Sequence, residues 1–409
     1  MSQPASPFDA GKPRYPALPR EEHDARLRGL QDRLVAAGLD GVILNNAANV
    51  AYYAGFRPSI LGANLVWTGL VVPASGEPRA IVSQPLSNLF LECSWVSHVQ
   101  PFGGSDYWGL PRDPMALVRD AAMTACGKGA RIGLERSLGM RVDLTREEIS
   151  RLDENLRDFD LFDAAPMLWQ QRIFKTSWEQ NVYRELGRIT SSGFRAGLAA
   201  ARAGVSEREI QRVMWSAFIA AGADDSPIGG QLMIRSGQER NLTYCGRATE
   251  RRLSRGDQLM LAGGPGLAGY HIDIHRFACI GAAPELQRTL FAQSEAGLAA
   301  AIEATRPGIP AREIYRVAHA AMMKKSATAV VPWKIFGHGL GLDNYEPPMV
   351  GADADETLAE GMVLTLEVPA YDIPEARVMG AFQEESVLVT ATGCEVLTSG
   401  VARDLYLTE

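Results

Sequence analysis

The sequence predicts a two-domain protein of the α/β (α+β) class whose second domain is an internal duplication. Three observations support this prediction. The chain has 409 residues, more than one hydrophobic core usually supports. Apolar residues in the first part alternate between helical and strand spacing. Beyond Lys175, two segments resemble each other at a nearly constant offset, as in a duplicated unit.

The first domain opens with a predicted helix over Glu21–Gly38, which Gly38 ends. Short apolar runs bounded by polar residues then predict strands at Gly41–Leu44, Leu65–Val72, Arg79–Val82 and Arg131–Glu135. A polar helix around Thr145–Arg157 precedes the domain boundary. We expect a flexible arm over residues 1–20, a first domain over 21–172 and a second domain over 173–409.

The second domain contains two copies of a helix-helix-strand unit. The first copy carries "AGVSEREI" (Ala203–Ile210) and then "GDQLML" (Gly256–Leu261). The second carries "PGIPAREI" (Pro307–Ile314) and then "GMVLTL" (Gly361–Leu366). A duplication of this kind brings equivalent strands together about a pseudo-twofold axis, where side chains from both copies face a common site.

Composition excludes several classes of partner. The net charge of −7 offers no basic face for nucleic acid. No stretch approaches the roughly 18 to 20 apolar residues of a membrane span, and the Pro-rich start is not typical of a secretion signal. The five scattered cysteines form no CxxC pair, so reduced thiols are expected. We therefore expect a cytoplasmic protein that binds neither nucleic acid nor membrane and acts on a small molecule.

Carboxylates and one histidine mark the candidate site. Glu367 follows an apolar run, and the Glu384–Glu385 pair follows about one hairpin later. The matching first-copy positions are expected at Ala262 and Asp273. Between the copies, His338 stands among glycines that let backbone approach closely. One imidazole with three carboxylates is a ligand set for Mn, Fe, Co or Zn, and a buried carboxylate must be paired, protonated or metal-bound.

Several segments resemble the creatinase/prolidase family, peptidase family M24, of the pita-bread fold. "GYHIDIHR" is similar to "GYxxDxxR", "GHGLGLDNYEPP" to "GHGxGxxxHExP", and "GMVLTLEVP" to "GMVxTxEP". The first domain resembles the creatinase-type N-terminal domain through "ARLRGLQDRLVAAGLDGVILNNAANVAYYAGF". The resemblance covers nearly the whole chain. It implies a creatinase-like α/β domain followed by a duplicated pita-bread catalytic domain.

The resemblance implies four metal ligands, namely Asp273, His338, Glu367 and Glu384. The fifth family ligand, an Asp, falls on Ala262, eleven positions before Asp273. Alanine cannot coordinate an ion, so two alternatives stay open. Either one divalent ion (Mn, Fe, Co or Zn) is bound by the other four residues, or catalysis is metal-free, as in creatinase, which this chain partly resembles.

Two outer histidines of the family's peptidases are also replaced, by Cys245 and Tyr345, and a family arginine becomes Phe382. Cys245 is either a nucleophile activated by a neighbouring imidazole or an inert buried thiol. His275 is either a substrate-facing acid or base, or a strand residue bonded across the sheet. The predicted catalytic residues are therefore Cys245, His275, Glu367 and Tyr345.

The segment Tyr270–His275 is predicted as a strand. Alternation along a regular strand places His271, Asp273 and His275 on one face. Tyr270 and His271 are predicted to bind substrate. The family resemblance implies a homodimer, in which Arg57 of the segment "GFRPSILGANLVW" binds a substrate carboxylate of the neighbouring site and Trp67 packs on it.

The predicted function is hydrolysis of an amide, peptide or amidine-type C–N bond of a small molecule. Three alternatives stay open: a lyase resembling the family's DMSP-cleaving branch, an Xaa-Pro peptidase, and a binding protein that kept the fold. A lyase would release an olefin without incorporating water, which separates it from a hydrolase.

Overall fold

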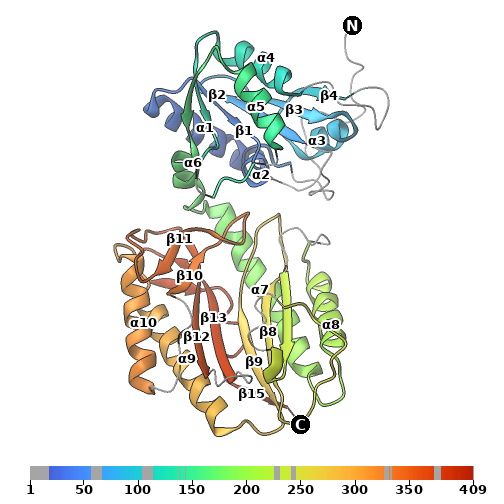
Figure 1. Cartoon of the computed structure of the whole chain (residues 1–409), viewed down its shortest axis with the longest axis vertical. Helices are drawn as coiled ribbons and strands as arrows, with labels where there is room; N and C mark the ends of the chain where they lie inside the picture. Colours follow the sequence, from blue (N-terminus) through green and yellow to red (C-terminus); the bar gives the residue numbers. More distant parts are fainter. Residues whose placement is uncertain are drawn as a thin grey trace. The chain divides into compact units, whose positions relative to one another are not determined.

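A computed structural model divides the chain into two compact units, residues 1–172 and 173–409 (Figure 1). The described residues are 18–56, 67–103, 114–137, 139–142, 144–224, 231–240, 246–326, 331, 334–372 and 379–408. Each unit has its own sheet and its own hydrophobic core, so each is described by itself.

The described part of the first unit contains a six-stranded mixed sheet in the order β4-β3-β2-β1-β5-β6. Its strands are β1 (Gly41–Leu44), β2 (Thr68–Pro73), β3 (Arg79–Ser83), β4 (His98–Phe102), β5 (Arg131–Leu134) and β6 (Asp160–Asp163). Its helices are α1 (Arg20–Ala37), α2 (Ala47–Ala54), the short 3₁₀ helix η1 (Gln84–Leu86), α3 (Ser87–Cys93), α4 (Pro114–Cys126), α5 (Arg146–Asn155) and α6 (Ala165–Arg172).

Helix ends in this unit follow local sequence signals. Gly38 ends α1 in the left-handed conformation (φ 64°), which glycine adopts without steric cost. Thr145 begins α5 through a reciprocal capping box with Glu148. Both helices are confirmed close to their predicted bounds. The core lies between the sheet and α4, and it includes Trp67, which is buried.

The described part of the second unit contains a nine-stranded sheet. Seven strands follow the order β11-β10-β12-β13-β9-β8-β7, while β14 pairs with β13 and β15 with β9. The strands are β7 (Gln231–Ser236), β8 (Gln258–Gly264), β9 (His275–Ile280), β10 (Ile335–Gly339), β11 (Glu346–Gly351), β12 (Val363–Asp372), β13 (Met379–Val389), β14 (Cys394–Val396) and β15 (Tyr406–Thr408). The helices are α7 (Ser177–Ala200), α8 (Glu207–Ala220), η2 (Gln238–Arg240), α9 (Glu285–Ala304) and α10 (Ala311–Lys325).

The strand order confirms the predicted duplication. The first copy supplies α7, α8 and the strands β7-β8-β9, and the second supplies α9, α10 and the strands β10-β12-β13. Outward from the antiparallel junction of β9 with β13, both sets run in the same order, from the last strand of the copy to the first: β9-β8-β7 on one side and β13-β12-β10 on the other (Figure 1). A pseudo-twofold axis therefore passes between these two strands.

The long helices pack on one face of the sheet. Residues of α7 and α8 share a core with Leu259 and Leu261 of β8, and residues of α9 and α10 share one with Leu364 and Leu366 of β12. Side chains alternate along a strand, so the residues between these leucines point to the opposite face. That opposite face carries the predicted site residues Glu367 and Glu384.

Three local predictions are wrong in detail. Glu367 lies inside β12 instead of following a strand, and Glu384 and Glu385 lie inside β13. Residues 271–274 form no regular strand, because β9 begins only at His275. Side chains take the place of a strand partner for two of its N–H groups, because Asp273 N–H donates to Ser386 Oγ (3.2 Å) and Ile274 N–H donates to Asp273 Oδ1 (3.1 Å).

Among the described residues, every helix is too short or too polar to cross a bilayer.

Candidate active site

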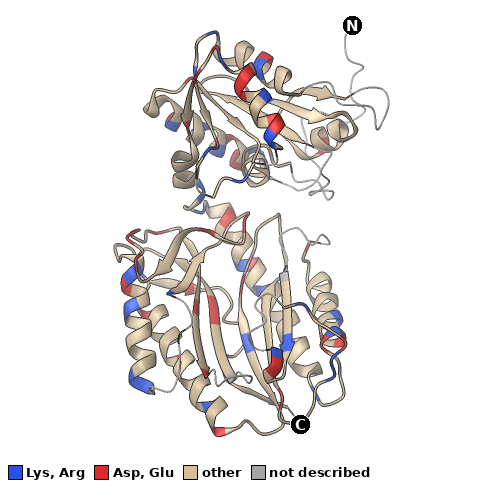
Figure 2. Cartoon of the chain, in the orientation of Figure 1, with Lys and Arg blue, Asp and Glu red and all other residues tan. Residues whose placement is uncertain are grey.

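A transverse row of four residues crosses the centre of the second unit's sheet. Ala262 on β8 pairs with His275 on β9, His275 with Glu384 on β13, and Glu384 with Glu367 on β12. Directly opposed residues of an antiparallel ladder point to the same face. The row therefore places two glutamates and one imidazole side by side. Figure 2 shows the acidic segments on β12 and β13 in red.

The observed strand pairing changes one predicted equivalence between the two copies. The pseudo-twofold axis exchanges β9 with β13, so the first-copy counterpart of Glu384 is His275 and not Asp273. Ala262 is the counterpart of Glu367, as predicted. The first copy thus presents a methyl group and an imidazole where the second copy presents two carboxylates.

Asp273 lies just before β9 and is buried. Ser386 fixes its backbone, accepting from its N–H and donating to its carbonyl oxygen (2.6 Å). Burial raises the pKa of the Asp273 carboxyl to about 7, and the nearby Glu384 raises it further, while a hydrogen bond from Asn344 opposes the change. Asp273 is therefore electrostatically part of the site although it lies outside the row.

The two glutamates of the row are also held in conditions that oppose ionisation. Burial raises the pKa of Glu384 to about 8, although the Thr365 hydroxyl donates a hydrogen bond to its carboxylate. Burial raises the pKa of Glu367 well above its ordinary value, and the charges of Glu384 and Asp273 raise it further. Three mutually repelling buried carboxyls are an arrangement that a divalent cation stabilises.

His338 lies on β10 opposite Thr365 of β12 and is fully buried. Its Nδ1 lies 3.0 Å from the carbonyl oxygen of Gly339. A carbonyl only accepts, so Nδ1 carries the proton and Nε2 holds a lone pair. Among the described residues, Nε2 has no hydrogen-bond partner, and burial lowers the pKa of His338 to about 4. A neutral imidazole with an oriented, unused lone pair is suited to bind a metal ion.

Glycines bring the strand of His338 close to its neighbour, as the sequence predicted. A Cβ atom at Gly337 would lie 2.1 Å from the carbonyl oxygen of Thr365. Another side chain at this position would push β10 away from β12 and move His338 off the site face.

His275 lies in the row next to Glu384. Its Nδ1 is 2.5 Å from Glu384 Oε2, yet the two atoms are not aligned for a hydrogen bond. Its ring stacks on Phe382, with centroids 4.3 Å apart and an interplanar angle of 28°. Burial lowers the pKa of His275 to about 3, so the imidazole is neutral at neutral pH. His275 thus contacts Glu384 across the sheet and stacks on Phe382, while its predicted role as an acid or base stays a prediction.

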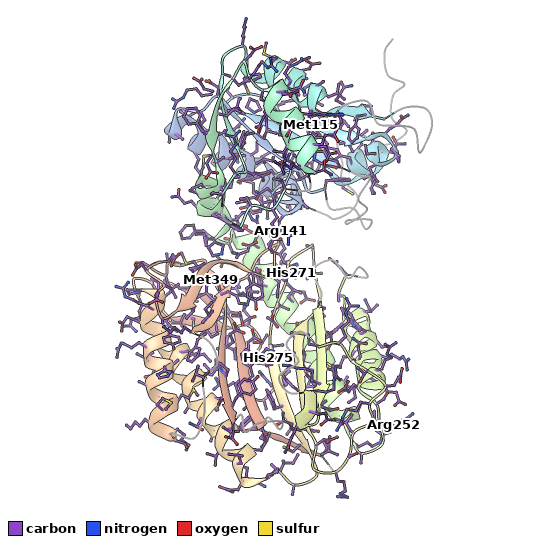
Figure 3. The ribbon with its side chains drawn as sticks, viewed as in Figure 1. Met115, Arg141, Arg252, His271, His275 and Met349 are labelled. Carbon is purple, nitrogen blue, oxygen red and sulfur yellow. The ribbon has the colours of Figure 1, made fainter. Side chains whose placement is uncertain are left out.

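Figure 3 shows His275 within the sheet and His271 beyond its end. His271 is half-buried, and its N–H donates to the carbonyl oxygen of Gly341 (3.0 Å). The predicted common face of His271, Asp273 and His275 rested on a regular strand and is therefore not supported. Tyr270 is buried, and its hydroxyl donates to Glu179 of α7 (2.7 Å).

Tyr345 precedes β11 and stacks on His338, with ring centroids 3.7 Å apart and an interplanar angle of 24°. Half of its surface is exposed (50%), so the ring covers His338 and also faces solvent. The next residue, Glu346, forms a buried ion pair with Lys175 (3.6 Å). The structure thus brings Tyr345 into the site through its contact with His338.

Three predicted residues do not enter this description of the site. Cys245 and Arg57 lie outside the described residues. Trp67 packs in the core of the first unit, close to Phe102, so it is not free to line a neighbouring site.

Sequence reasoning missed Thr365 and Ser386, which bond Glu384 and Asp273. Alternation along "LTLEV" and "EESV" could have placed both on the face of the glutamates. It also missed Arg235, a buried cation inside the apolar strand β7. A charged residue within the apolar run of a strand could have identified this position as unusual.

The donor chemistry fits a divalent ion, but the arrangement is incomplete. In the part of the chain that the structure describes, no group of three or more His, Cys, Asp or Glu side chains is arranged to hold an ion. The fit rests instead on the three carboxyls with raised pKa values and on the unused His338 Nε2.

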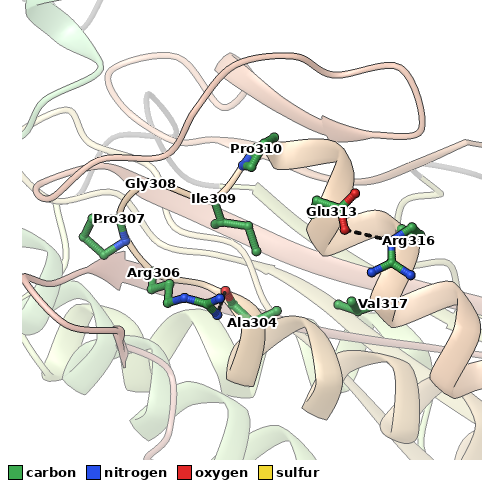
Figure 4. Close-up of a pocket in the computed structure, with 9 residues that line it drawn as sticks. All are labelled: Ala304, Arg306, Pro307, Gly308, Ile309, Pro310, Glu313, Arg316 and Val317. Carbon is green, nitrogen blue, oxygen red and sulfur yellow. Dashed lines mark hydrogen bonds and ion pairs between the residues drawn. The ribbon is translucent and has the colours of Figure 1, made fainter.

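A surface cleft lies elsewhere in this unit, at the turn between α9 and α10 (Figure 4). It is lined by Arg306, Glu313 and Arg316 among others, and Glu313 pairs with Arg316 (2.7 Å). None of the predicted site residues lines it. The cleft is therefore separate from the candidate active site.

Two features together define a class of protein. A duplicated helix-helix-strand domain places buried carboxyls and a histidine at its pseudo-twofold axis, and a separate α/β domain precedes it. Comparison with known proteins gives the family. Residues 181–391 match the model of metallopeptidase family M24, and residues 26–174 match the creatinase/prolidase N-terminal domain. The chain belongs to metallopeptidase family M24 and is a hydrolase of this family's two-domain type.

Individual relatives agree with this assignment. The chain is 24% identical to the uncharacterized peptidase YqhT of Bacillus subtilis, over 91% of this chain and 97% of that protein. It is 28% identical to the Xaa-Pro dipeptidase of Pyrococcus furiosus, over 64% of this chain and 73% of that protein. The solved Xaa-Pro dipeptidase from Bacillus anthracis has the same fold, with a TM-score of 0.77 at 21% identity, covering 94% and 99% of the two chains.

Proposed function

We propose that this protein hydrolyses an amide or peptide C–N bond of a small molecule, using one divalent ion held by Asp273, His338, Glu367 and Glu384. The observation that carries this proposal is the pair of buried carboxyls, Glu367 and Glu384, with the neutral imidazole of His338 on one sheet face, and the buried carboxyl of Asp273 close enough to raise the pKa of Glu367. When bound, a divalent ion supplies a water of lowered pKa and polarises the scissile carbonyl group. Mn, Fe, Co and Zn all suit these ligands.

We propose that the site holds one ion and not two. Ala262 offers no donor, and the ring of Phe382 lies against His275 on that side of the row. The first-copy half of the row is therefore apolar where a second ion would require another carboxylate.

The chain's own residues orient the reacting groups. The Thr365 hydroxyl holds one oxygen of Glu384, and the Gly339 carbonyl fixes the tautomer of His338. His275 is neutral and unprotonated at Nδ1 or Nε2, so it can accept a proton near Glu384. We propose His275 as the group that moves protons, in place of the outer histidines replaced by Cys245 and Tyr345.

A metal-free hydrolase is the second candidate. The observation that favours it is the loss of the carboxylate at Ala262, together with the apolar contact of Phe382 with His275. In this version Glu367 and Glu384 bind a cationic substrate, and His275 accepts the proton. Its substrates would be amidine-type or other cationic small molecules.

The substrate and the assembly are proposed from the relatives. Two of them are named Xaa-Pro dipeptidases, so dipeptides with proline in the second position are the first compounds to test. The replacement of two family histidines favours a substrate that differs from a standard peptide. The homodimer with Arg57 near the neighbouring site stays a prediction, and light scattering of the purified protein tests it.

Product analysis in ¹⁸O-labelled water tests the proposed reaction. Chelated protein is reloaded with Mn, Fe, Co or Zn and supplied with Xaa-Pro dipeptides, N-acetyl amino acids and amidines. A hydrolase places one labelled oxygen in the acyl product, which is a carboxylate from a peptide or N-acetyl amino acid and an amide carbonyl from an amidine. An unlabelled olefinic product would instead identify a lyase, and turnover that persists in chelator would identify the metal-free reaction.

A further inference from the structure

Two buried charged residues, Lys175 and Glu179, stand at the start of the second unit, where 4% and 1% of their surfaces are exposed. The N–H of Lys175 donates to the carbonyl oxygen of Gly361, just before β12 (2.8 Å). Glu179 accepts from the N–H of Thr176 (2.9 Å), which caps the start of α7. The backbone and the helix start are thus fixed, and each charged side chain reaches a different segment of the site.

The side chain of Lys175 reaches the loop that follows His338. Its Nζ lies 3.6 Å from Glu346 Oε2, and both side chains are almost fully buried. The other Glu346 oxygen accepts from the N–H of Asp343 (3.1 Å). Desolvation offsets much of the attraction in a buried ion pair, so its net contribution to stability is small. The geometric effect of this pair is to fix residues 341–346, and we call it the loop anchor.

The loop held by this anchor contacts two proposed ligands of the ion. Tyr345 stacks on His338, with ring centroids 3.7 Å apart. The Asn344 side chain donates a hydrogen bond to the Asp273 carboxylate. Asn344, Tyr345 and Glu346 are consecutive, so a shift of the Glu346 carboxylate moves both contacts together. The loop anchor therefore fixes the surroundings of two ligands at once.

The side chain of Glu179 reaches the segment that precedes Asp273. The Tyr270 hydroxyl donates to Glu179 Oε1 (2.7 Å), a bond that we call the segment anchor. His271 donates its N–H to the carbonyl oxygen of Gly341 (3.0 Å), which joins this segment to the loop. Regular strand pairing begins only at β9, so Asp273 depends on such local bonds for its position.

We propose that the loop anchor and the segment anchor hold Asp273 and His338 in position for the divalent ion. Lys175 and Glu179 are thus positioning residues, and Tyr270 acts through Asp273 instead of touching the substrate. This inference rests on the proposed function, because it concerns the ligands of the proposed ion. Residues that orient metal ligands typically contribute roughly 10- to 100-fold to metal affinity.

Titration of chelated protein with Co²⁺ tests both anchors. Tyr270→Phe removes only the hydroxyl of the segment anchor. Lys175→Met combined with Glu346→Gln replaces the loop anchor by neutral side chains of similar size, so that no buried charge loses its partner. Each variant should raise the Kd of Co²⁺ about tenfold and alter the visible absorption of the bound ion, which reports its coordination. Melting temperatures in chelator should stay within about 5 °C of the wild type.

Each anchor has a matched control variant. Tyr53→Phe removes a buried hydroxyl that donates to Gln171 (3.1 Å) in the first unit. Arg184→Gln removes an ion pair that joins α7 to Glu395 of β14 (2.9 Å). Neither of these contacts includes a residue of the loop or of the segment before Asp273. Both controls should keep the Kd of Co²⁺ within about twofold of the wild type and leave its absorption unchanged.

Amide hydrogen exchange of chelated protein separates this inference from the proposed function, because it needs no bound ion. Exchange of the His271 N–H, which bonds Gly341, should be at least about tenfold faster in both anchor variants than in the controls. Wild-type protein that binds no Co²⁺ would refute the one-ion function, while faster exchange would still support the anchors. Exchange at the control rate overturns the inference. A Kd that stays at the wild-type value, or that rises only in proportion to lost folding, also overturns it.

Discussion

Glu367 and Glu384 stand directly opposite each other in the β12–β13 ladder, and both carboxyls are buried. Like charges at directly opposed positions destabilise a sheet. Glu385, the residue after Glu384, points to the other face of the sheet and is paired with a positive charge. It accepts a hydrogen bond from Arg276 (2.6 Å). Glu367 and Glu384 on one face and Glu385 on the other therefore have different effects on stability, and unfolding measurements distinguish them.

Glu367→Gln should stabilise the chelated protein by about 1 kcal/mol, because the folded state no longer buries a carboxyl whose ionisation is opposed by burial and by Glu384 and Asp273. The same change should weaken binding of a divalent ion at least tenfold. Thermal unfolding with chelator and titration with Mn or Zn measure the two effects. Glu385→Gln is the control, and it should destabilise the protein by about 3 to 5 kcal/mol because it leaves Arg276 buried without its carboxylate. Equal destabilisation by both changes would contradict the account.

Stability of the chelated protein should fall as pH rises from 6.5 to 8. Folded Asp273 and Glu384 have pKa values of about 7 and 8, above their ordinary values of 3.8 and 4.5, so the folded state holds more protons in this range. Each such carboxyl lowers the free energy of unfolding by at most about 1.4 kcal/mol per pH unit.

His275 and His338 oppose this trend only at lower pH. Their folded pKa values of about 3 and 4 lie below the ordinary 6.5, so their contribution increases with pH up to that value and then stays constant. A saturating divalent ion should remove the loss between pH 6.5 and 8. Denaturant unfolding at several pH values checks both statements, and a chelated protein whose stability rises over this range would refute them.

His275→Gln should lower kcat by about 10²-fold or more, the usual contribution of a positioned proton-transfer group. Metal content should not change, because His275 is not one of the proposed ligands. Steady-state kinetics and metal analysis of the same preparation measure these effects. A variant that loses the ion together with its activity would make His275 a ligand, and one that keeps full activity would remove it from the reaction.

Tyr345→Ala should raise KM and expose His338, because the tyrosine ring covers that imidazole at 3.7 Å. Tyr345→Phe keeps the stacked ring and should behave like the wild type in KM. Kinetics of the two variants therefore test whether the ring or the hydroxyl matters. If Tyr345→Phe loses activity while Tyr345→Ala does no further harm, the hydroxyl is catalytic and the ring serves no separate purpose.

The sequence predicted the helices and strands well where local signals decide them. Gly38 ends α1, and the repeat around Gly256 and Gly361 predicted the two halves of the sheet. The register of pairing between distant strands could not be predicted from local signals in the same way. The pairing of Glu384 with His275 depends on a junction between distant strands, so no spacing in the sequence could identify it.

The irregular backbone before β9 could not be predicted from the sequence for a similar reason. "GYHIDIH" alternates like a strand, but Ser386 bonds the backbone of Asp273 in place of a neighbouring strand. Arg235 was visible as a charge within an apolar run, but only its pairing with Met260 shows which face it occupies. Long-range pairing thus decided each feature that the sequence did not predict.

The metal content of protein purified without chelator or added metal, measured by mass spectrometry with activity before and after chelation, tests the central claim most directly. The account predicts about one transition-metal ion per chain, lost together with hydrolysis and restored with it. Two ions per chain, or full hydrolysis by metal-free protein, would contradict the single-ion site of Asp273, His338, Glu367 and Glu384.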